Sequence, residues 1–202
     1  MKGMVRRFPL YLLALLLSTA LASCSEADNE EEEFADWQTR NEQYFSQLYA
    51  TAQGNTAQYQ LIRSYTKSTS ASLAPTDYIV VEPISSGTGT ASPYLTDSVQ
   101  IHYRGRLIPS ASYPEGYQFE TTWQGTFDEA TATPLSTVYY TFVDGFATVL
   151  QHMHRGDHWR VYIPYQLAYG VNANGSIPAY STLIFEIYLT DFWTDKRGDR
   201  AD

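Results

Sequence analysis

The sequence has a single cysteine, a shortage of basic residues and no apolar run long enough to span a bilayer. One cysteine excludes a disulfide within the chain, so the core has to be held together by packing alone. The apolar run over residues 10–17 is far shorter than the roughly 20 residues that a membrane-spanning helix needs. No internal repeat is visible, and 202 residues suit one compact domain with an extension.

Positive charge is scarce, because 13 Lys and Arg residues face 22 Asp and Glu residues and the formal net charge is −9. A chain this acidic cannot neutralise a row of phosphates, which excludes nucleic acid as a partner. An anionic membrane surface would not attract it either. Any membrane contact must therefore come from apolar groups.

The first 23 residues have the order of a secretory signal peptide, with basic residues before the apolar run and small residues after it. The segment ends Leu21-Ala22-Ser23-Cys24, which resembles the lipobox of bacterial lipoproteins. This resemblance implies that Cys24 carries lipid and becomes the first residue of the mature chain. Cleavage there leaves 10 basic against 22 acidic residues, a formal charge of −12. The alternative is a soluble secreted protein.

Residues 24–33 are predicted to be an acidic tether, in which Ser25 is followed by a run rich in Glu. Like charges packed this densely stay solvated and extended, which favours a flexible spacer. The alternative is an export address, since an acidic stretch after the lipidated cysteine directs some Bacteroidetes lipoproteins to the cell surface.

Residues 34–76 are predicted to be a helical segment followed by a linker. Apolar residues at three- and four-residue steps predict an amphipathic helix over 34–52, ended by Gly54. The stripe consists of Phe34, Trp37, Asn41, Tyr44, Phe45, Leu48 and Tyr49. A second short helix is expected over 58–65, and residues 64–75 read as the linker. So wide a stripe needs a partner surface, either the chain's own domain or, as the alternative, a second copy in a homodimer.

The period changes after Asp77, and residues 77–193 are predicted to form an α+β domain. Alternation predicts strands or β-like runs over 78–81, 98–107, 117–119, 138–142, 159–163 and 182–192. One short helix is expected over 144–154, with Asp144 as its N-cap and Gly156 as its stop. Antiparallel strands around one helix make an α+β fold. Residues 194–202 read as a polar tail.

The order of short motifs in this domain resembles that of FKBP-type peptidyl-prolyl cis-trans isomerases, in a bacterial, Bacteroidetes-like lipoprotein form. The motifs are Ile101-His102-Tyr103-Arg104-Gly105, residues 117–122, 142–146 and 152–160, Ile163-Pro164 with Leu167-Ala168-Tyr169-Gly170, and Ile177-Pro178 with residues 182–186. They occur in the family's order and at near-family spacing. The resemblance implies an antiparallel sheet wrapped around one short α-helix, here preceded by the N-terminal amphipathic helix.

The resemblance also implies an apolar site that holds a proline ring. Carried over by position, its residues are Tyr103, Phe119, Phe146, Tyr169 and Phe185 in the aromatic wall, Phe142 and Val143 at the rim, Glu120 as the family's carboxylate, and Ile177 in the flap. Glu120 stands where most members have Asp, and Phe146 where the best-studied members have Trp. No residue of 123–137 is assigned to the site, and no cofactor is implied.

Rotation about an X–Pro bond has to overcome a barrier of about 18–20 kcal/mol that is set by amide resonance. An apolar cage lowers this barrier by removing water from the planar amide, and donors placed for the rotated carbonyl lower it further. By resemblance, these donors are the Tyr169 hydroxyl and the Val143 N–H. The reaction therefore needs no acid–base pair.

Two other interpretations start from the same residues. From periodicity alone, Tyr103, Phe146 and Phe185 would be ordinary core residues. The nearby histidines and one aspartate, which are His152, His154, Asp157 and His158, could indicate a metal site. Side chains two apart on a helix point to different faces, however, and a metal needs three or four convergent ligands.

We therefore expect a peptidyl-prolyl isomerase that acts on proline-containing unfolded or extended polypeptides in the cell envelope. Its lipid would anchor it to a membrane, in our prediction the outer membrane, on the periplasmic side or at the cell surface. The alternatives are a non-catalytic FKBP-fold chaperone or peptide-binding module and, further away, a surface glycan-binding lipoprotein, since fold does not fix function.

Overall fold

The computed structural model describes residues 33–68, 72–138 and 141–194. Residues from Asp36 onward form one compact unit, separate from the residues up to Ala35. The predicted signal peptide, Cys24, most of the acidic tether and the tail from residue 195 lie outside the described residues. Within them, no helix is long and apolar enough to cross a bilayer.

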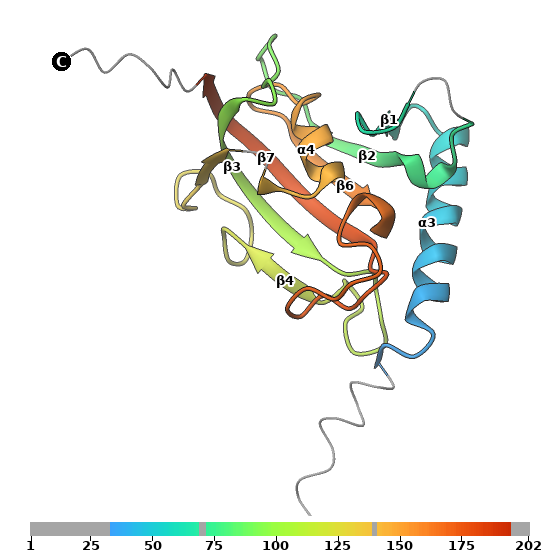
Figure 1. Cartoon of the computed structure of the whole chain (residues 1–202). Coiled ribbons are helices and arrows are strands. Elements are labelled where there is room, and N and C mark those ends of the chain that lie inside the picture. The colour runs from blue at the N-terminus through green and yellow to red at the C-terminus, as the bar shows by residue number, and fades with distance from the viewer. Residues whose placement is uncertain (1–32, 69–71, 139–140, 195–202) are drawn as a thin grey trace, which may run out of the picture. The chain divides into compact units, whose positions relative to one another are not determined.

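Seven antiparallel strands make one sheet in the order β1-β2-β6-β7-β3-β4, with β5 paired to β3 (Figure 1). The strands are β1 (Gln60–Arg63), β2 (Tyr78–Ser85), β3 (Asp97–Arg106), β4 (Gln118–Thr121), β5 (Leu135–Val138), β6 (His158–Ile163) and β7 (Leu183–Thr194). The helices are α3 (Trp37–Gly54) and α4 (Asp144–Leu150), with the short 3-10 turns η1 (Pro75–Asp77) and η3 (Tyr165–Leu167). The predicted α+β class, with a short helix against an antiparallel sheet, is confirmed.

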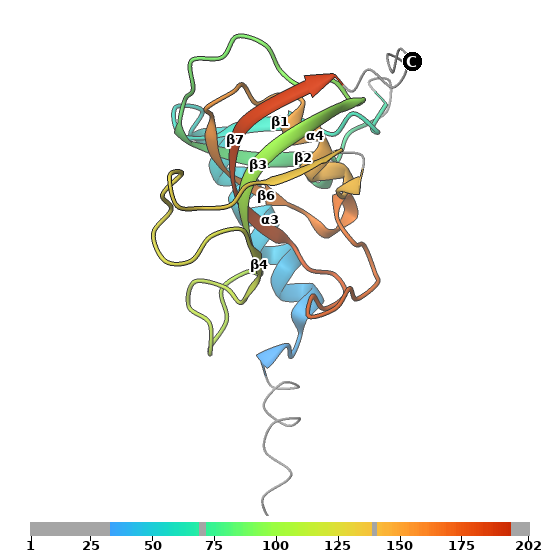
Figure 2. The same cartoon turned by 90° about the vertical axis from the view of Figure 1, so that its left-hand side faces the viewer.

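Helices α3 and α4 both lie against the sheet (Figures 1 and 2), and alternation along β2, β6 and β7 gives the sheet two buried faces. The inner face faces α4 and consists of Ile79, Val81, Val161, Ile163, Leu183, Phe185 and Ile187. The outer face carries Val80, Tyr162 and Ile184, which are cross-strand neighbours. These three pack against Phe45 and Ala52 of α3. Each helix therefore covers one face, as strand alternation requires.

α4 lies close to the sheet because Gly145 has no side chain. A Cβ there would stand 2.4 Å from the Ile163 Cγ2 atom. The helix ends at Leu150, earlier than predicted, because the buried Asp157 carboxylate accepts hydrogen bonds from the N–H groups of His154 and Gly87, at 2.8 and 2.7 Å. These bonds fix a local turn in place of another helical turn. Gly156, predicted as the helix stop, lies in that turn.

Asp144 is not the predicted N-cap but the first residue of α4, and Val143 occupies the cap without a side-chain bond. The Asp144 carboxylate instead accepts hydrogen bonds from the hydroxyls of Ser64 and Thr66, at 2.8 and 2.6 Å. A negative charge in the first helical turn also suits the helix dipole. Asp144 therefore links α4 to the segment that follows β1.

The short helix predicted over 58–65 is wrong, because this segment contains strand β1. β1 pairs antiparallel with β2, and Leu61 stands opposite Val80. Ile62 is buried, while its neighbours on the strand are more exposed. A helix this short is marginal by itself, so pairing with a long, apolar strand decides its conformation. The sheet therefore begins before Asp77.

The N-terminal helix is confirmed, although it begins at Trp37 because Asp36 has a left-handed φ of 53°. Its apolar stripe includes Asn41, which is fully buried. The Asn41 Oδ1 atom accepts a hydrogen bond from the Thr182 N–H at 2.7 Å, and its Nδ2 donates to the Trp37 carbonyl at 2.7 Å. The Trp37 indole N–H donates to the Ser181 hydroxyl at 2.9 Å. α3 is thereby tied to the chain just before β7.

Replacing Asn41 by Ala should lower the free energy of unfolding by about 1–3 kcal/mol, because the buried Thr182 N–H loses its acceptor. Urea unfolding followed by circular dichroism measures the change. Gln38→Ala is the matched control, since the Gln38 amide bonds Glu42 on the exposed side of the same helix. It should cost less than about 0.5 kcal/mol. Equal urea midpoints for the two variants would contradict the role given to Asn41.

Candidate active site

Five aromatic rings meet on the inner face of the sheet, and we call Tyr103, Phe119, Phe142, Phe146 and Phe185 the aromatic cluster. The Phe146 ring stacks on Phe142 with 4.4 Å between centroids and stands edge-on to Phe185 at 4.9 Å. Tyr103 of β3 lies 5.9 Å from Phe146. Phe119 of β4 lies 5.6 Å from Phe185. The structure therefore brings together five of the nine residues that the sequence predicts for the site.

The aromatic cluster has a buried floor and a solvent-facing side. Phe146, Tyr103 and Phe185 are 1%, 5% and 6% exposed, whereas Phe119 and Phe142 are only partly buried. Edge-to-face contacts between rings favour such an arrangement beyond the burial of area. The partly exposed rings therefore form an apolar surface that a ligand can reach.

Gly105 of β3 makes room for the outermost ring. A Cβ at this position would lie 2.4 Å from the Phe119 Cε2 atom and 2.8 Å from the Phe185 Cε1 atom. Gly105 pairs with Glu120 on one side and with Phe185 on the other. The absence of a side chain at Gly105 therefore allows Phe119 to lie across β3 and reach Phe185.

A hydroxyl and a carboxylate border the aromatic cluster. Burial raises the pKa of the Tyr103 hydroxyl well above its usual value, and the Glu120 carboxylate that accepts its hydrogen bond raises this pKa further. Tyr169 also raises the pKa of the Tyr103 hydroxyl, so the Tyr169 side chain lies nearby. Tyr103 therefore stays protonated around neutral pH. Glu120 itself is exposed.

Two further predicted residues lie between η3 and β7. Tyr169 is 38% exposed and precedes Gly170, whose φ of 65° makes the turn. Ile177 is 5% exposed and exchanges two backbone hydrogen bonds with Asn174, at 2.9 and 3.0 Å. One ordered segment thus carries both side chains.

α3 holds both ends of this segment. The Tyr165 hydroxyl, at its start, donates to Glu42 of α3 at 3.0 Å. Asn41 of α3 accepts from Thr182 at its end. The N-terminal helix, which lies outside the predicted isomerase domain, therefore helps to position Tyr169 and Ile177.

Val143, the last of the nine predicted residues, is placed by the start of α4. It is the N-cap, with φ −61° and ψ 154°, and its carbonyl accepts the Ala147 N–H at 3.0 Å. The N–H of an N-cap residue has no partner within its own helix. Because Phe142 precedes it directly, this N–H stands beside the aromatic cluster.

The segment 123–137, which the family pattern does not assign, contributes rings to the opposite face. Phe127 lies 4.9 Å from Trp123, 5.3 Å from His102 and 5.2 Å from Tyr188. His102 is therefore buried, and burial lowers its pKa below the usual value. The Arg104 guanidinium lies over the Trp123 ring at 4.6 Å. The spacing of Trp123 and Phe127, which are four residues apart, is the only sequence signal that points to this packing.

The histidines near α4 serve separate contacts. His152 Nδ1 bonds the Thr148 carbonyl at 2.9 Å, and its ring stacks on Tyr65 at 5.0 Å. His154 lies 3.4 Å from Asp157, and His158 bonds Glu186 at 2.9 Å. Among the residues that the structure describes, no three His, Cys, Asp or Glu side chains converge as a metal site would require.

The family described as FKBP-type peptidyl-prolyl cis-trans isomerase matches residues 89–190, half of the chain. The match includes every ring of the aromatic cluster. The chain belongs to this FKBP-type family. The resemblance read from the short motifs is therefore confirmed for the FKBP-type domain.

Three relatives illustrate the similarity. The chain is 32% identical over 125 residues to the macrophage infectivity potentiator of Trypanosoma cruzi. This alignment covers 61% of this chain and 58% of that protein. The chain is 35% identical over 109 residues to the FKBP-type 22 kDa peptidyl-prolyl cis-trans isomerase of Escherichia coli, with 54% and 47% covered. It is 35% identical over 107 residues to the outer membrane protein MIP of Legionella longbeachae, with 52% and 40% covered. The FKBP-type chain thus spans about half the length of these relatives.

The crystal structure of FkpA from Escherichia coli is similar in fold, with a TM-score of 0.55 and 23% sequence identity. The similarity covers 83% of this chain and 64% of that one. It therefore extends beyond the half of the chain that matches the family.

Gly105→Ala should displace the Phe119 and Phe185 rings of the FKBP-type domain, because the new methyl group would occupy their positions. We expect the NMR resonances of both rings to shift and the free energy of unfolding to fall by about 1–3 kcal/mol, as overpacking usually does. Gly54→Ala is the control, since a Cβ there meets no atom within 4 Å. Unshifted ring resonances in a folded Gly105→Ala protein would contradict this geometry.

Proposed function

We propose that the chain is a peptidyl-prolyl cis-trans isomerase that assists the folding of proline-containing, unfolded or extended polypeptides. The observation that carries the proposal is the aromatic cluster of an FKBP-type domain, with a buried floor and a reachable side. A proline ring would lie against Phe119 and Phe142, above Phe146. This surface replaces water around the X–Pro amide with apolar rings.

Removal of water favours the twisted amide, because water hydrogen bonds stabilise the planar, charge-separated form of the peptide bond. Donors fixed near the rotated carbonyl stabilise it further. In our proposal these donors are the Tyr169 hydroxyl and the Val143 N–H. Glu120 would act indirectly, by holding the Tyr103 hydroxyl at the border of the aromatic cluster.

A chymotrypsin-coupled assay on a short X–Pro peptide tests the proposal. The wild-type protein should accelerate isomerisation, and Phe119→Ala should abolish most of this activity because it opens the aromatic cluster to water. Tyr169→Phe should cost far less, since one hydrogen bond contributes about 0.5–1.5 kcal/mol, roughly a two- to tenfold change in rate. Circular dichroism must first show that each variant is folded, because Phe119 is partly buried and a fully buried Phe→Ala change costs about 3–5 kcal/mol of stability.

The competing function is a non-catalytic FKBP-fold chaperone or peptide-binding module. It would use the same apolar surface to hold an unfolded chain without turning its prolyl bonds. A wild-type protein that is inactive on every X–Pro peptide, yet suppresses aggregation of an unfolded client, would overturn the isomerase and establish this alternative.

We further propose that lipid on Cys24 holds the chain in the cell envelope, at the outer membrane. The residue order of the signal segment supports this, and one relative is named an outer membrane protein. Cys24→Ala should release the protein from the membrane fraction or block its maturation. Wild-type protein that takes up no labelled fatty acid would contradict the anchor.

The homodimer through the N-terminal helix remains the alternative for the state of assembly. Burial of Phe45 and Trp37 against the chain's own domain favours a monomer, because it leaves less of the apolar stripe for a second copy. Light scattering of the purified protein at high concentration distinguishes the two states by mass.

A further inference from the structure

The outer face of the sheet carries a row of alternating charges across four strands. Glu82 of β2 stands opposite Arg160 of β6, Arg160 opposite Glu186 of β7, and Glu186 opposite Arg104 of β3. α3 covers the sheet on one side of this row, and the rings around Phe127 cover it on the other side. The charged row between these two packed regions is only partly buried.

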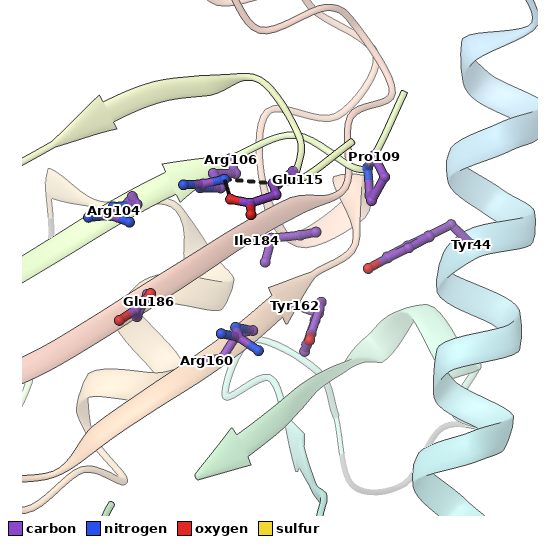
Figure 3. Close-up of a pocket in the computed structure, with 9 residues that line it drawn as sticks. All are labelled: Tyr44, Arg104, Arg106, Pro109, Glu115, Arg160, Tyr162, Ile184 and Glu186. Atoms are coloured by element: carbon purple, nitrogen blue, oxygen red, sulfur yellow. Dashed lines mark hydrogen bonds and ion pairs between the residues drawn. The ribbon is translucent and has the colours of Figure 1, made fainter. Parts of the chain in front are cut away.

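A hollow of about 380 Å³ lies over this part of the sheet (Figure 3). We call it the outer groove. Its lining consists of Tyr44, Arg104, Arg106, Pro109, Glu115, Arg160, Tyr162, Ile184 and Glu186. Arg104 and Glu186 lie on the face of the sheet opposite to Tyr103 and Phe185, because successive side chains on a strand alternate. The outer groove is thus a different site from the aromatic cluster.

Arginine is concentrated here although the chain is acidic. Three of the six arginines in the described part of the chain line the outer groove. The formal net charge of the whole chain is −9. Two carboxylates, Glu115 and Glu186, accompany the three guanidinium groups in the lining. The side chains that line the outer groove therefore carry a net positive charge, whereas the whole chain is net negative.

The carboxylates of the charged row are satisfied mainly by groups other than arginine. Glu82 accepts hydrogen bonds from the Gln58 amide at 2.8 Å and from the Tyr162 hydroxyl at 3.2 Å. Glu186 bonds His158 at 2.9 Å. Arg160, which has five N–H donors, approaches Glu82 only at 3.4 Å and otherwise lies beside the Tyr162 hydroxyl. Arg160 therefore has donors to spare.

The other two guanidinium groups have partners on one side, and Arg104 also lies over the Trp123 ring at 4.6 Å. Arg104 donates to the Gly125 carbonyl at 2.7 Å, but its buried Nε has no partner among the described residues. Arg106 donates to the Glu115 carboxylate at 2.8 Å and to the Glu115 backbone carbonyl at 3.2 Å, and the Glu115 side chain is 84% exposed. An ion pair with so exposed a carboxylate contributes little, and another carboxylate can replace the Glu115 side chain at small cost. The Glu115 carboxylate therefore occupies the position beside Arg106 that a ligand carboxylate would take.

We propose that the outer groove binds a carboxylate of an extended polypeptide. A guanidinium offers parallel N–H groups in a planar fork that matches the two oxygens of a carboxylate. Arg106 and Arg160 would bind the carboxylate, while Tyr44 and Ile184 contact the adjoining apolar part of the peptide. The open groove, bounded by α3, admits a chain from solvent. This inference stands apart from the isomerase activity, because neither the groove nor its test involves a prolyl bond.

Calorimetric titration of the purified full chain at about 50 mM salt, where surface charges are weakly screened, tests the proposal. The first peptide is an acetylated and amidated Gly-Glu repeat, and the matched peptide has Gln in place of Glu. A third peptide, the Gln repeat with a free C-terminal carboxylate, distinguishes a chain end from an acidic side chain as the source. Inorganic phosphate serves as the small-anion control.

We expect the Glu peptide or the free chain end to bind, and the neutral peptide not to bind. Arg160→Gln and Arg106→Gln should each weaken binding by about tenfold, since each removes a hydrogen bond between charged groups. Glu115→Gln should strengthen it, because the competing carboxylate is removed. Arg155→Gln, which breaks the exposed pair with Asp191 outside the groove, should have no effect.

Three results would overturn the proposal. The first is an absence of binding by either carboxylate-bearing peptide. The second is binding that the Arg160 and Arg106 substitutions leave unchanged. The third is phosphate that binds as tightly as the peptides and with the same dependence on these arginines, which would show a general anion site.

Discussion

The packing of Phe146 between Phe142 and Phe185 is the interaction on which both the fold and the proposed site depend. Phe146 is almost fully buried and holds α4 against the inner face, where Gly145 permits close contact with Ile163. The same ring forms the floor of the aromatic cluster. One side chain therefore serves core packing and, in the proposed function, would also contact the ligand, and interiors this tightly packed transmit small displacements.

The two faces of the sheet carry different sites. The inner face holds the aromatic cluster, and the outer face holds α3, the rings around Phe127 and the outer groove. α3 contributes to both, because Asn41 and Glu42 hold the segment with Tyr169 and Ile177, while Tyr44 lines the groove. The N-terminal helix is therefore an integral part of the folded unit.

Much of the inner face could be predicted from the sequence, because its strands alternate and its aromatic residues stand in motifs of an FKBP-type domain. The structure brings Tyr103, Phe119, Phe142, Phe146 and Phe185 together, as the motifs implied. Two of the errors have a common physical cause, which is contact between residues far apart in the chain. β1 is a strand because β2 pairs with it, and Asp144 is engaged by hydroxyls 78 and 80 residues away.

The outer groove could not be predicted, since Arg104 and Arg106 lie on β3 whereas Arg160 lies on β6, and no short motif links the two strands. Their proximity follows from the register of β3, β6 and β7, which only the folded sheet defines. The requirement for glycine at position 105 could not be predicted either, because it depends on the Phe119 ring of the neighbouring strand.

In the proposed mechanism, this site would turn a prolyl bond by excluding water and fixing donors, without proton transfer. The pH dependence of kcat/KM for an X–Pro peptide, measured in parallel in H2O and D2O, tests it most directly. Because the pKa of Tyr103 is raised, its hydroxyl stays protonated over this range, and we predict a nearly flat profile from about pH 6 to 8 with little solvent isotope effect. A bell-shaped profile with a large isotope effect would contradict the claim.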